Sequence, residues 1–167
     1  CHILSDSRYL GDAMMQSMQS ITWLGDDDLL SARNRDSLDM QTRAMLARYA
    51  GNIEDFAQSL RSLRRQEIER LAISWMCGLI DDDTSMSAMS DVFDAVLDAA
   101  LKWSMHQAAL KMKLDSPVSS IAIIAMGRYG GREVNFCSDA DIIVVYEPTY
   151  AHGYSDSDYL AFSFAQT

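Results

Sequence analysis

No apolar run in this 167-residue chain is long enough to cross a bilayer, and the chain does not begin with the basic and apolar residues of a secretory signal. We therefore expect a cytoplasmic protein with no membrane partner. Because the sequence starts at Cys1 and not at a methionine, we expect it to be a segment excised from a longer protein.

Cysteine and basic residues are also scarce. Cys1, Cys77 and Cys137 are too few and too far apart for a disulfide framework or a thiolate metal site, so we expect reduced thiols, with Cys77 as a small core residue. The 14 Lys and Arg residues face 24 Asp and Glu residues, which gives a net charge of −10. Since nucleic-acid backbones are held mainly by Lys and Arg, this balance argues against a nucleic-acid partner.

The composition is otherwise that of a soluble globular protein, with 49% hydrophobic and 23% charged residues. A chain of this length can build one sizeable core, or one domain and part of another. Apolar residues recur at helical spacing through most of its first 114 positions. The predicted helices span residues 5–24, 36–50, 53–79 and 85–113.

The ends of these helices carry capping and turn residues. Ser5 or Asp6 is predicted to cap the first helix, and residues 25–28 are predicted to form the turn after it. Residues 81–83 are all aspartates, and they precede the last helix, where carboxylates favour the positive end of the helix dipole. We interpret this acidic run as capping chemistry and not as a metal loop.

The helix predicted over residues 53–79 carries a mixed set of charges. They are Arg61, Arg64, Arg65, Glu67, Glu69 and Arg70. One interpretation is a solvated face supported by pairs such as Arg65 with Glu69. The other is a patch that contacts phosphate or a partner.

The pattern changes after Pro117. Residues 118–126 are mostly apolar and rich in β-branched residues, with two serines near the start, and this pattern predicts a strand covered on both faces. We place a domain boundary here, between a helical region (residues 1–114) and the start of a second domain (residues 115–167). The predicted fold class is α+β.

A glycine turn follows this strand at residues 127–131, and Asp139 and Asp141 come soon after it. The turn lacks the glycine order of a dinucleotide fold and the Gly-Lys end of a P-loop, so alone it allows close approach of either a ligand phosphate or a neighbouring strand. The aspartates open a second apolar run, residues 142–145, which predicts a second strand in the covered sheet. Side chains two apart on a strand share one face, and paired carboxylates there repel each other unless a cation lies between them. Mg²⁺, bound by carboxylates and substrate phosphates, fits this pattern.

The motif Gly127-Arg-Tyr-Gly-Gly-Arg-Glu-Val-Asn-Phe-Cys-Ser-Asp-Ala-Asp141 closely resembles the signature of the glutamine synthetase adenylyltransferases, which belong to the polymerase-β-like nucleotidyltransferase superfamily. Residues 4–10, 63–72 and 89–101 resemble segments that precede this signature in the family. The resemblance thus covers nearly the whole chain. It implies that the second domain is the beginning of a polymerase-β-like sheet.

The resemblance also implies an activity and its residues. Family members have two related halves, of which one transfers AMP from ATP to a tyrosine of glutamine synthetase and the other removes it by phosphorolysis. The residues of the motif are more similar to those of the second, adenylylating half. Asp139 and Asp141 would be catalytic ligands of Mg²⁺, Gly127 and Arg128 would lie at the nucleotide phosphates, and Ser138 would approach a phosphate oxygen. Glutamine synthetase and a PII-type signalling protein would be the partners.

The superfamily pattern includes a third carboxylate on a later strand. Downstream acids here are Glu147, Asp156 and Asp158, and the last two fit better as the cap of a helix beginning at Tyr159. We therefore expect the isolated chain to have at most weak metal affinity and no useful transferase activity. Two alternatives stay open: the adenylyl-removing half or another nucleotidyltransferase, and a catalytically degenerate helical docking module.

Overall fold

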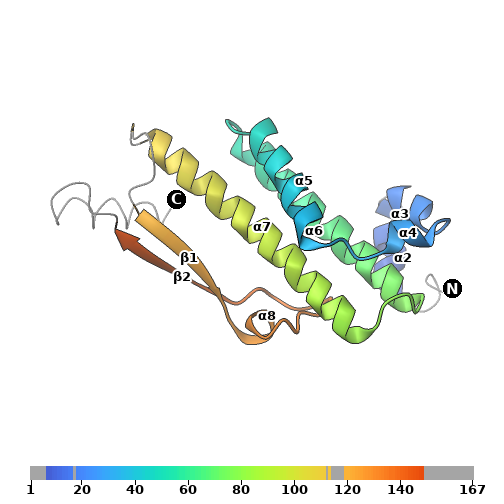
Figure 1. Cartoon of the computed structure of the whole chain (residues 1–167). Helices are drawn as coiled ribbons and strands as arrows, with labels where there is room; N and C mark the ends of the chain where they lie inside the picture. The colour runs from blue at the N-terminus through green and yellow to red at the C-terminus, as the bar shows by residue number, and fades with distance from the viewer. Residues whose placement is uncertain (1–6, 17, 112, 114–118, 149–167) are drawn as a thin grey trace.

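The computed structural model describes residues 7–16, 18–111, 113 and 119–148, and it confirms the α+β class: helices come first and an antiparallel pair of strands follows (Figure 1). The helices are α2 (Arg8–Gln16), α3 (Met18–Trp23), α4 (Asp27–Leu30), α5 (Arg35–Arg48), α6 (Ile53–Met76), α7 (Asp82–Lys111) and the short α8 (Gly127–Gly130). The strands are β1 (Ser119–Ala125) and β2 (Ile142–Pro148).

Helix α7 is the scaffold of the molecule. Figure 1 shows α5 and α6 on one side of it and the two strands on the other. Helices α6 and α7 run antiparallel, because Phe56 near the start of α6 stacks on Trp103 near the end of α7, with ring centroids 5.6 Å apart and an interplanar angle of 16°. At the opposite end, Leu71 belongs to the same core cluster as Met89. Apolar burial therefore continues along both helices.

The core comprises three apolar clusters among the described residues. The first joins α5, α6 and α7 to the segment after β1, through Leu38, Leu71, Ala88, Met89, Val92, Phe93, Ala95, Tyr129 and Val134. The second packs the N-terminal helices on the end of α6, and the third joins the start of α6 to the end of α7. Because Tyr129 and Val134 lie in the first cluster, the glycine turn is anchored in the helical core.

Three of the predicted helices are confirmed, with ends within about three residues of the prediction. Their N-termini are capped by side chains that accept from backbone amides: Asn34 from Ser37 (2.9 Å), Asn52 from Asp55 (3.1 Å) and Asp81 from Thr84 (2.8 Å). Hydrogen bonding by Thr84 lowers the pKa of the Asp81 carboxyl. The acidic run therefore caps α7, as predicted.

The predicted helix over residues 5–24 is confirmed at residues 8–16 and 18–23, and residue 17 lies outside the described residues. The turn predicted at residues 25–28 is wrong in part, because α4 begins at Asp27. Leu10 and Met14 are buried as predicted, but Ile21 is 58% exposed. The reason is that Ser20 turns inward to donate to Glu69, which rotates the next residue toward solvent. Ser5 and Asp6 lie outside the described residues.

The charges of α6 divide into two groups. Arg61, Arg64 and Arg65 are exposed, as a solvated face requires. The other three charged residues are buried, which corrects that interpretation for half of the set: Glu67 pairs with Arg70 and with Arg33, and Glu69 accepts from Ser20 and does not pair with Arg65. The reason is that α2, α3 and α4 pack over this end of α6.

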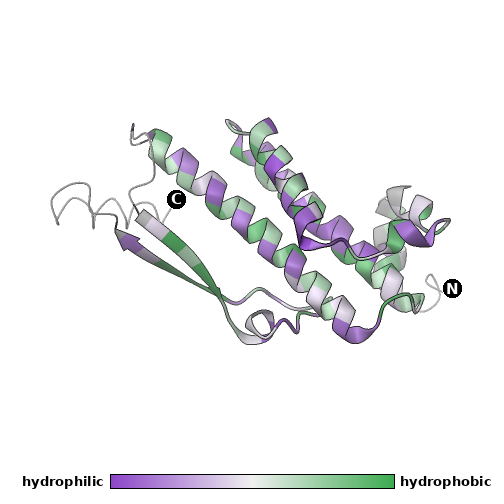
Figure 2. Cartoon of the chain, viewed as in Figure 1, coloured by the Kyte–Doolittle hydropathy of each residue, from purple (hydrophilic) through white to green (hydrophobic). Residues whose placement is uncertain are grey.

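The strands do not form the sheet that was predicted to be covered on both faces. In β1, Ile121, Ile123 and Ala125 are half-buried while Ala122 and Ile124 are exposed. In β2, residues 142–146 are between 38% and 48% exposed. Figure 2 shows these strands as a hydrophobic band beside α7. Only the α7 side of β1 is covered by described elements, so the apolar run does not itself produce burial.

Two further predictions concern residues that the structure does not describe. The boundary proposed between residues 114 and 115 stays a prediction, because residues 114–118 are outside the described set. The same is true of Asp156, Asp158 and the helix from Tyr159. Within the described residues, no helix is long and apolar enough to cross a membrane.

Met89 gives a direct test of the first cluster, because its side chain is 1% exposed. Met89→Ala is expected to lower the free energy of unfolding of the 167-residue chain by about 2–5 kcal/mol, through lost burial and the cavity left behind. Met40, which is 69% exposed, supplies the matched control. Equal urea-unfolding midpoints for Met89→Ala and Met40→Ala would contradict this packing.

Glu67 gives a pH test of the buried charges. Burial raises the pKa of its carboxyl above the ordinary 4.5, against the opposing charges of Arg70 and Arg33. A raised pKa means that Glu67 contributes stability below about pH 4.5, and that this contribution is lost as the pH rises through the folded pKa. Glu67→Gln removes this dependence, so the stability of the variant relative to wild type should increase between about pH 4 and pH 7. Urea unfolding measures it, with exposed Glu54→Gln as the control; a difference that falls with pH would refute the account.

Candidate functional site

The glycine turn is one turn of helix that begins directly after β1. Met126 occupies the N-cap position, and the Gly130 amide donates to the Met126 carbonyl at 2.8 Å. The turn closes through two further backbone bonds, from Gly131 to Gly127 (3.0 Å) and from Glu133 to Arg128 (2.7 Å). Since each of these bonds joins residues four or five apart, the glycine turn is a compact, internally bonded unit.

Two of its glycines are required by close approaches. Gly127 has a φ of +54°, and a Cβ there would lie 3.1 Å from Oδ2 of Asp141. A Cβ on Gly130 would lie only 2.6 Å from the carbonyl oxygen of Ala125. The turn can therefore fold back on the end of β1 and lie against Asp141 only if both positions lack a side chain.

Asp139 and Asp141 precede β2, which begins at Ile142, so the two-residue strand spacing predicted to align them does not apply. Asp141 is instead placed by its backbone: its carbonyl accepts from the Met126 amide at 2.8 Å, which extends the pairing of Ala125 with Ile142 by one step. This bond brings the Asp141 carboxylate to Gly127. Both aspartates are exposed, and neither carboxylate has an ion pair or hydrogen bond with the described residues.

Two exposed carboxylates with uncommitted oxygens fit part of a Mg²⁺ site, because Mg²⁺ prefers hard oxygen ligands and completes its shell with substrate phosphates and water. Asp139 and Asp141 are the residues that would hold the ion. The described part of the chain contains no group of three His, Cys, Asp or Glu residues that could bind a metal. The donor set is therefore partial within these residues.

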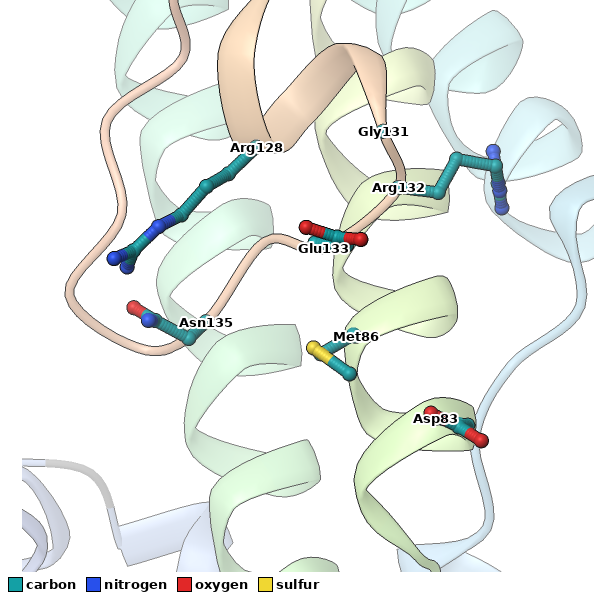
Figure 3. Close-up of a pocket in the computed structure, with 7 residues that line it drawn as sticks. All are labelled: Asp83, Met86, Arg128, Gly131, Arg132, Glu133 and Asn135. Atoms are coloured by element: carbon teal, nitrogen blue, oxygen red, sulfur yellow. The ribbon is translucent and has the colours of Figure 1, made fainter.

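Arg128 lies on the turn between Gly127 and Tyr129, is exposed, and has no ion-pair partner among the described residues. It lines a pocket of about 580 Å³ between the turn and the start of α7 (Figure 3). In Figure 3 its side chain extends toward the side of the pocket where Asn135 lies, and Arg132 points the other way. The other lining residues are Asp83, Met86, Gly131 and Glu133. The guanidinium is thus free to meet an anion at the mouth of this pocket.

Ser138 is half-buried in the loop before the aspartates. Its hydroxyl donates to Oδ1 of Asn135 at 2.9 Å and accepts from the Asn135 amide at 3.0 Å. The Asn135 oxygen also accepts from the Cys137 amide at 3.0 Å. The single hydroxyl proton is committed to this loop, so contact with a phosphate oxygen would require it to change partner. Its phosphate role stays a prediction.

Sequence reasoning missed the contacts that hold the turn to the helices. Tyr129 is buried, and its hydroxyl donates to Asp94 of α7 at 2.6 Å. Burial and this bond to a carboxylate raise the pKa of Tyr129, so the hydroxyl stays a proton donor. Arg132 reaches Asp91 (2.7 Å) and Asp94 (3.4 Å). The sequence feature that could have indicated these contacts is the spacing of Asp91 and Asp94, which lie three apart on one face of a helix.

The sequence matches the family model of glutamate-ammonia ligase adenylyltransferase over residues 1–165. The chain belongs to this family. It is 54% identical over 148 residues to the bifunctional glutamine synthetase adenylyltransferase/adenylyl-removing enzyme of Bifidobacterium longum (strain DJO10A), a match that covers 89% of the chain and 14% of that relative.

Two more family members extend the comparison. The proteins of the same name from Leifsonia xyli subsp. xyli and Corynebacterium efficiens are each 35% identical, over 149 and 164 residues. These matches cover 89% and 96% of the chain, and 14% and 15% of the relatives. The chain therefore spans about one-seventh of the length of the relatives it matches. Family membership is shown, while the half to which the segment corresponds is not distinguished by these names.

The glycines provide a matched pair of variants. Gly130→Ala is expected to destabilise the turn by about 1–3 kcal/mol, since its Cβ would overlap the Ala125 carbonyl. Gly131→Ala is the control: its φ is −81° and its Cβ would meet ordinary contacts at 3.6 Å. Thermal unfolding of the two variants measures the difference. Equal stability of both would show that the turn does not fold back on β1 in this way.

Proposed function

We propose that this chain contributes the metal-binding and phosphate-binding part of an adenylyltransferase centre that moves AMP from ATP to a tyrosine of glutamine synthetase, in the presence of Mg²⁺. The observation that carries the proposal is the placement of the Asp141 carboxylate against Gly127, where a Cβ would stand 3.1 Å away, with Asp139 two residues earlier. The family match and the relatives' names support the reaction class and the target.

In this reaction the tyrosine oxygen forms a bond to the α-phosphorus of ATP, the bond to the bridging oxygen breaks, and pyrophosphate leaves. The phenolic proton must pass to a base, and the carboxylate of Asp139 or Asp141 has suitable chemistry for this role. A bound Mg²⁺ would neutralise charge on the reacting phosphates.

The chain's own residues bind and orient in this scheme. Asp139 and Asp141 would hold the cation, which would neutralise charge on the phosphates. Gly127 leaves room for the approach of the phosphate chain to the Asp141 carboxylate, and Arg128 supplies a positive charge beside it. Ser138 is proposed to approach a phosphate oxygen after releasing Asn135.

Transfer of AMP to the tyrosine is proposed over its removal, on the similarity of the motif to the adenylylating half. The removing reaction would use the same carboxylates with phosphate as the attacking group, and both activities appear in the relatives' names. A PII-type regulator and a cytoplasmic location are further parts of the proposal. A degenerate docking module is disfavoured by the uncommitted oxygens of the two carboxylates, because a structural loop has no need for them.

The test uses a chimera in which this chain replaces the matching segment of the Bifidobacterium longum relative. Asp139→Asn and Asp141→Asn are each expected to lower AMP transfer from ATP to glutamine synthetase at least about 100-fold, because each removes a charge aimed at the reacting phosphates. Asp27→Asn, which removes an exposed carboxylate of α4, is the control. Unchanged transfer in Asp139→Asn would favour the docking module. Loss of phosphorolysis with unchanged transfer would assign the segment to the removing half.

A further inference from the structure

Asp94 of α7 joins the helical region to the glycine turn. Its Oδ1 accepts from the Tyr129 hydroxyl at 2.6 Å, and its Oδ2 lies 3.4 Å from Nη1 of Arg132 and 3.2 Å from Nη1 of Arg35. Arg35 is the first residue of α5. One carboxylate therefore holds three side chains, from α5, from α8 and from the loop after α8. We refer to Arg35, Asp94, Tyr129 and Arg132 as the Asp94 network.

Arg132 contacts several groups of α7 in addition to Asp94. Besides Asp94, its Nη2 donates to Asp91 at 2.7 Å and to the Ser87 carbonyl oxygen at 3.1 Å. Its backbone has a φ of +57°, in the left-handed region where a non-glycine residue is disfavoured. Glycine would adopt this conformation freely, as Gly127 does in the same turn. The side chain's contacts with α7 thus offset a backbone cost that a glycine would avoid.

Tyr129 connects Asp94 of α7 to the glycine turn. It is 5% exposed and packs on Phe93, with ring centroids 5.6 Å apart. It follows Gly127 and Arg128 directly in α8, so its hydroxyl bond and its ring fix the orientation of that helical turn relative to α7. A buried phenol without its acceptor would lose this single orientation, because the desolvated hydroxyl would seek another partner.

We propose that Asp94 is a positioning residue for nucleotidyl transfer, which acts through Tyr129 and Arg132 to hold Gly127 against Asp141 and Arg128 at the mouth of its pocket. The inference rests on the proposed function. Asp94 itself lies on α7 and is not among the residues that would bind the metal or the phosphates. Its effect is therefore expected on the nucleotide and not on the protein substrate.

Arg132→Gly and Asp94→Asn in the chimera test this role. Arg132→Gly removes the contacts with α7 while it relieves the left-handed backbone, so the thermal midpoint should change little. Asp94→Asn keeps an oxygen that can accept from Tyr129 but loses the charge that holds both arginines. For each variant, kcat/KM for ATP is expected to fall about 10- to 100-fold through misplacement of the turn, with the KM for glutamine synthetase unchanged.

Lys102→Gln is the matched control, since it breaks an exposed ion pair with Asp98 on the same helix. It should leave both kinetic parameters unchanged. If Arg132→Gly and Asp94→Asn both keep kcat/KM for ATP within about twofold while Asp139→Asn abolishes transfer, the positioning role is overturned and the proposed function stands. Equal increases in KM for both substrates, or activity lost only in proportion to folded protein, would overturn it as well. Undiminished transfer by Asp139→Asn would instead refute the proposed function.

Discussion

The contact between the Asp94 carboxylate and the Tyr129 hydroxyl connects the two parts of this molecule, because the glycine turn reaches the helices there. Partly exposed ion pairs such as that of Arg132 with Asp94 contribute only about 0–1 kcal/mol each. Full burial of an aromatic or aliphatic side chain contributes more, about 1.5–3 kcal/mol, and Tyr129 and Val134 are both buried in the first apolar cluster. Apolar packing thus supplies most of the attachment energy, while the polar contacts select one orientation of the turn.

That orientation matters because the candidate site is built from very short-range geometry. The Met126 amide bonded to the Asp141 carbonyl aligns two segments that lie 15 positions apart in sequence. The missing side chain of Gly127 lets the Asp141 carboxylate lie against the turn. A shift of about 1 Å in either segment would change which groups face a bound phosphate, and such shifts are costly to catalysis. The helical region therefore acts by fixing the position of the glycine turn, although none of its residues is proposed to bind the nucleotide.

The sequence predicted the long helices well, since their apolar spacing and the acidic cap at Asp81 are local signals. It failed where a distant contact decides the outcome. Ser20 faces inward because it bonds Glu69, which is 49 positions away, so the apolar spacing misplaced Ile21. Spacing predicted that Asp139 and Asp141 share one face of a strand, but both precede β2, and the position of Asp141 depends on its backbone pairing with Met126. The roles of Tyr129 and Arg132 depend on α7, which the motif itself does not contain.

Asp139 and Asp141, beside the glycine turn, are proposed to form the cation-binding part of this chain. The chain offers an internal comparison, because three further aspartates lie at the start of α7: Asp81 caps the helix, and Asp82 and Asp83 are in its first turn. Titration of the 167-residue chain with Mn²⁺ in the presence of ATP, followed by paramagnetic broadening of assigned amide signals, distinguishes the two acidic groups. Broadening centred on Gly127, Asp139 and Asp141 is the predicted result. Broadening centred on residues 81–83, with the signals of the turn unaffected, would contradict the account.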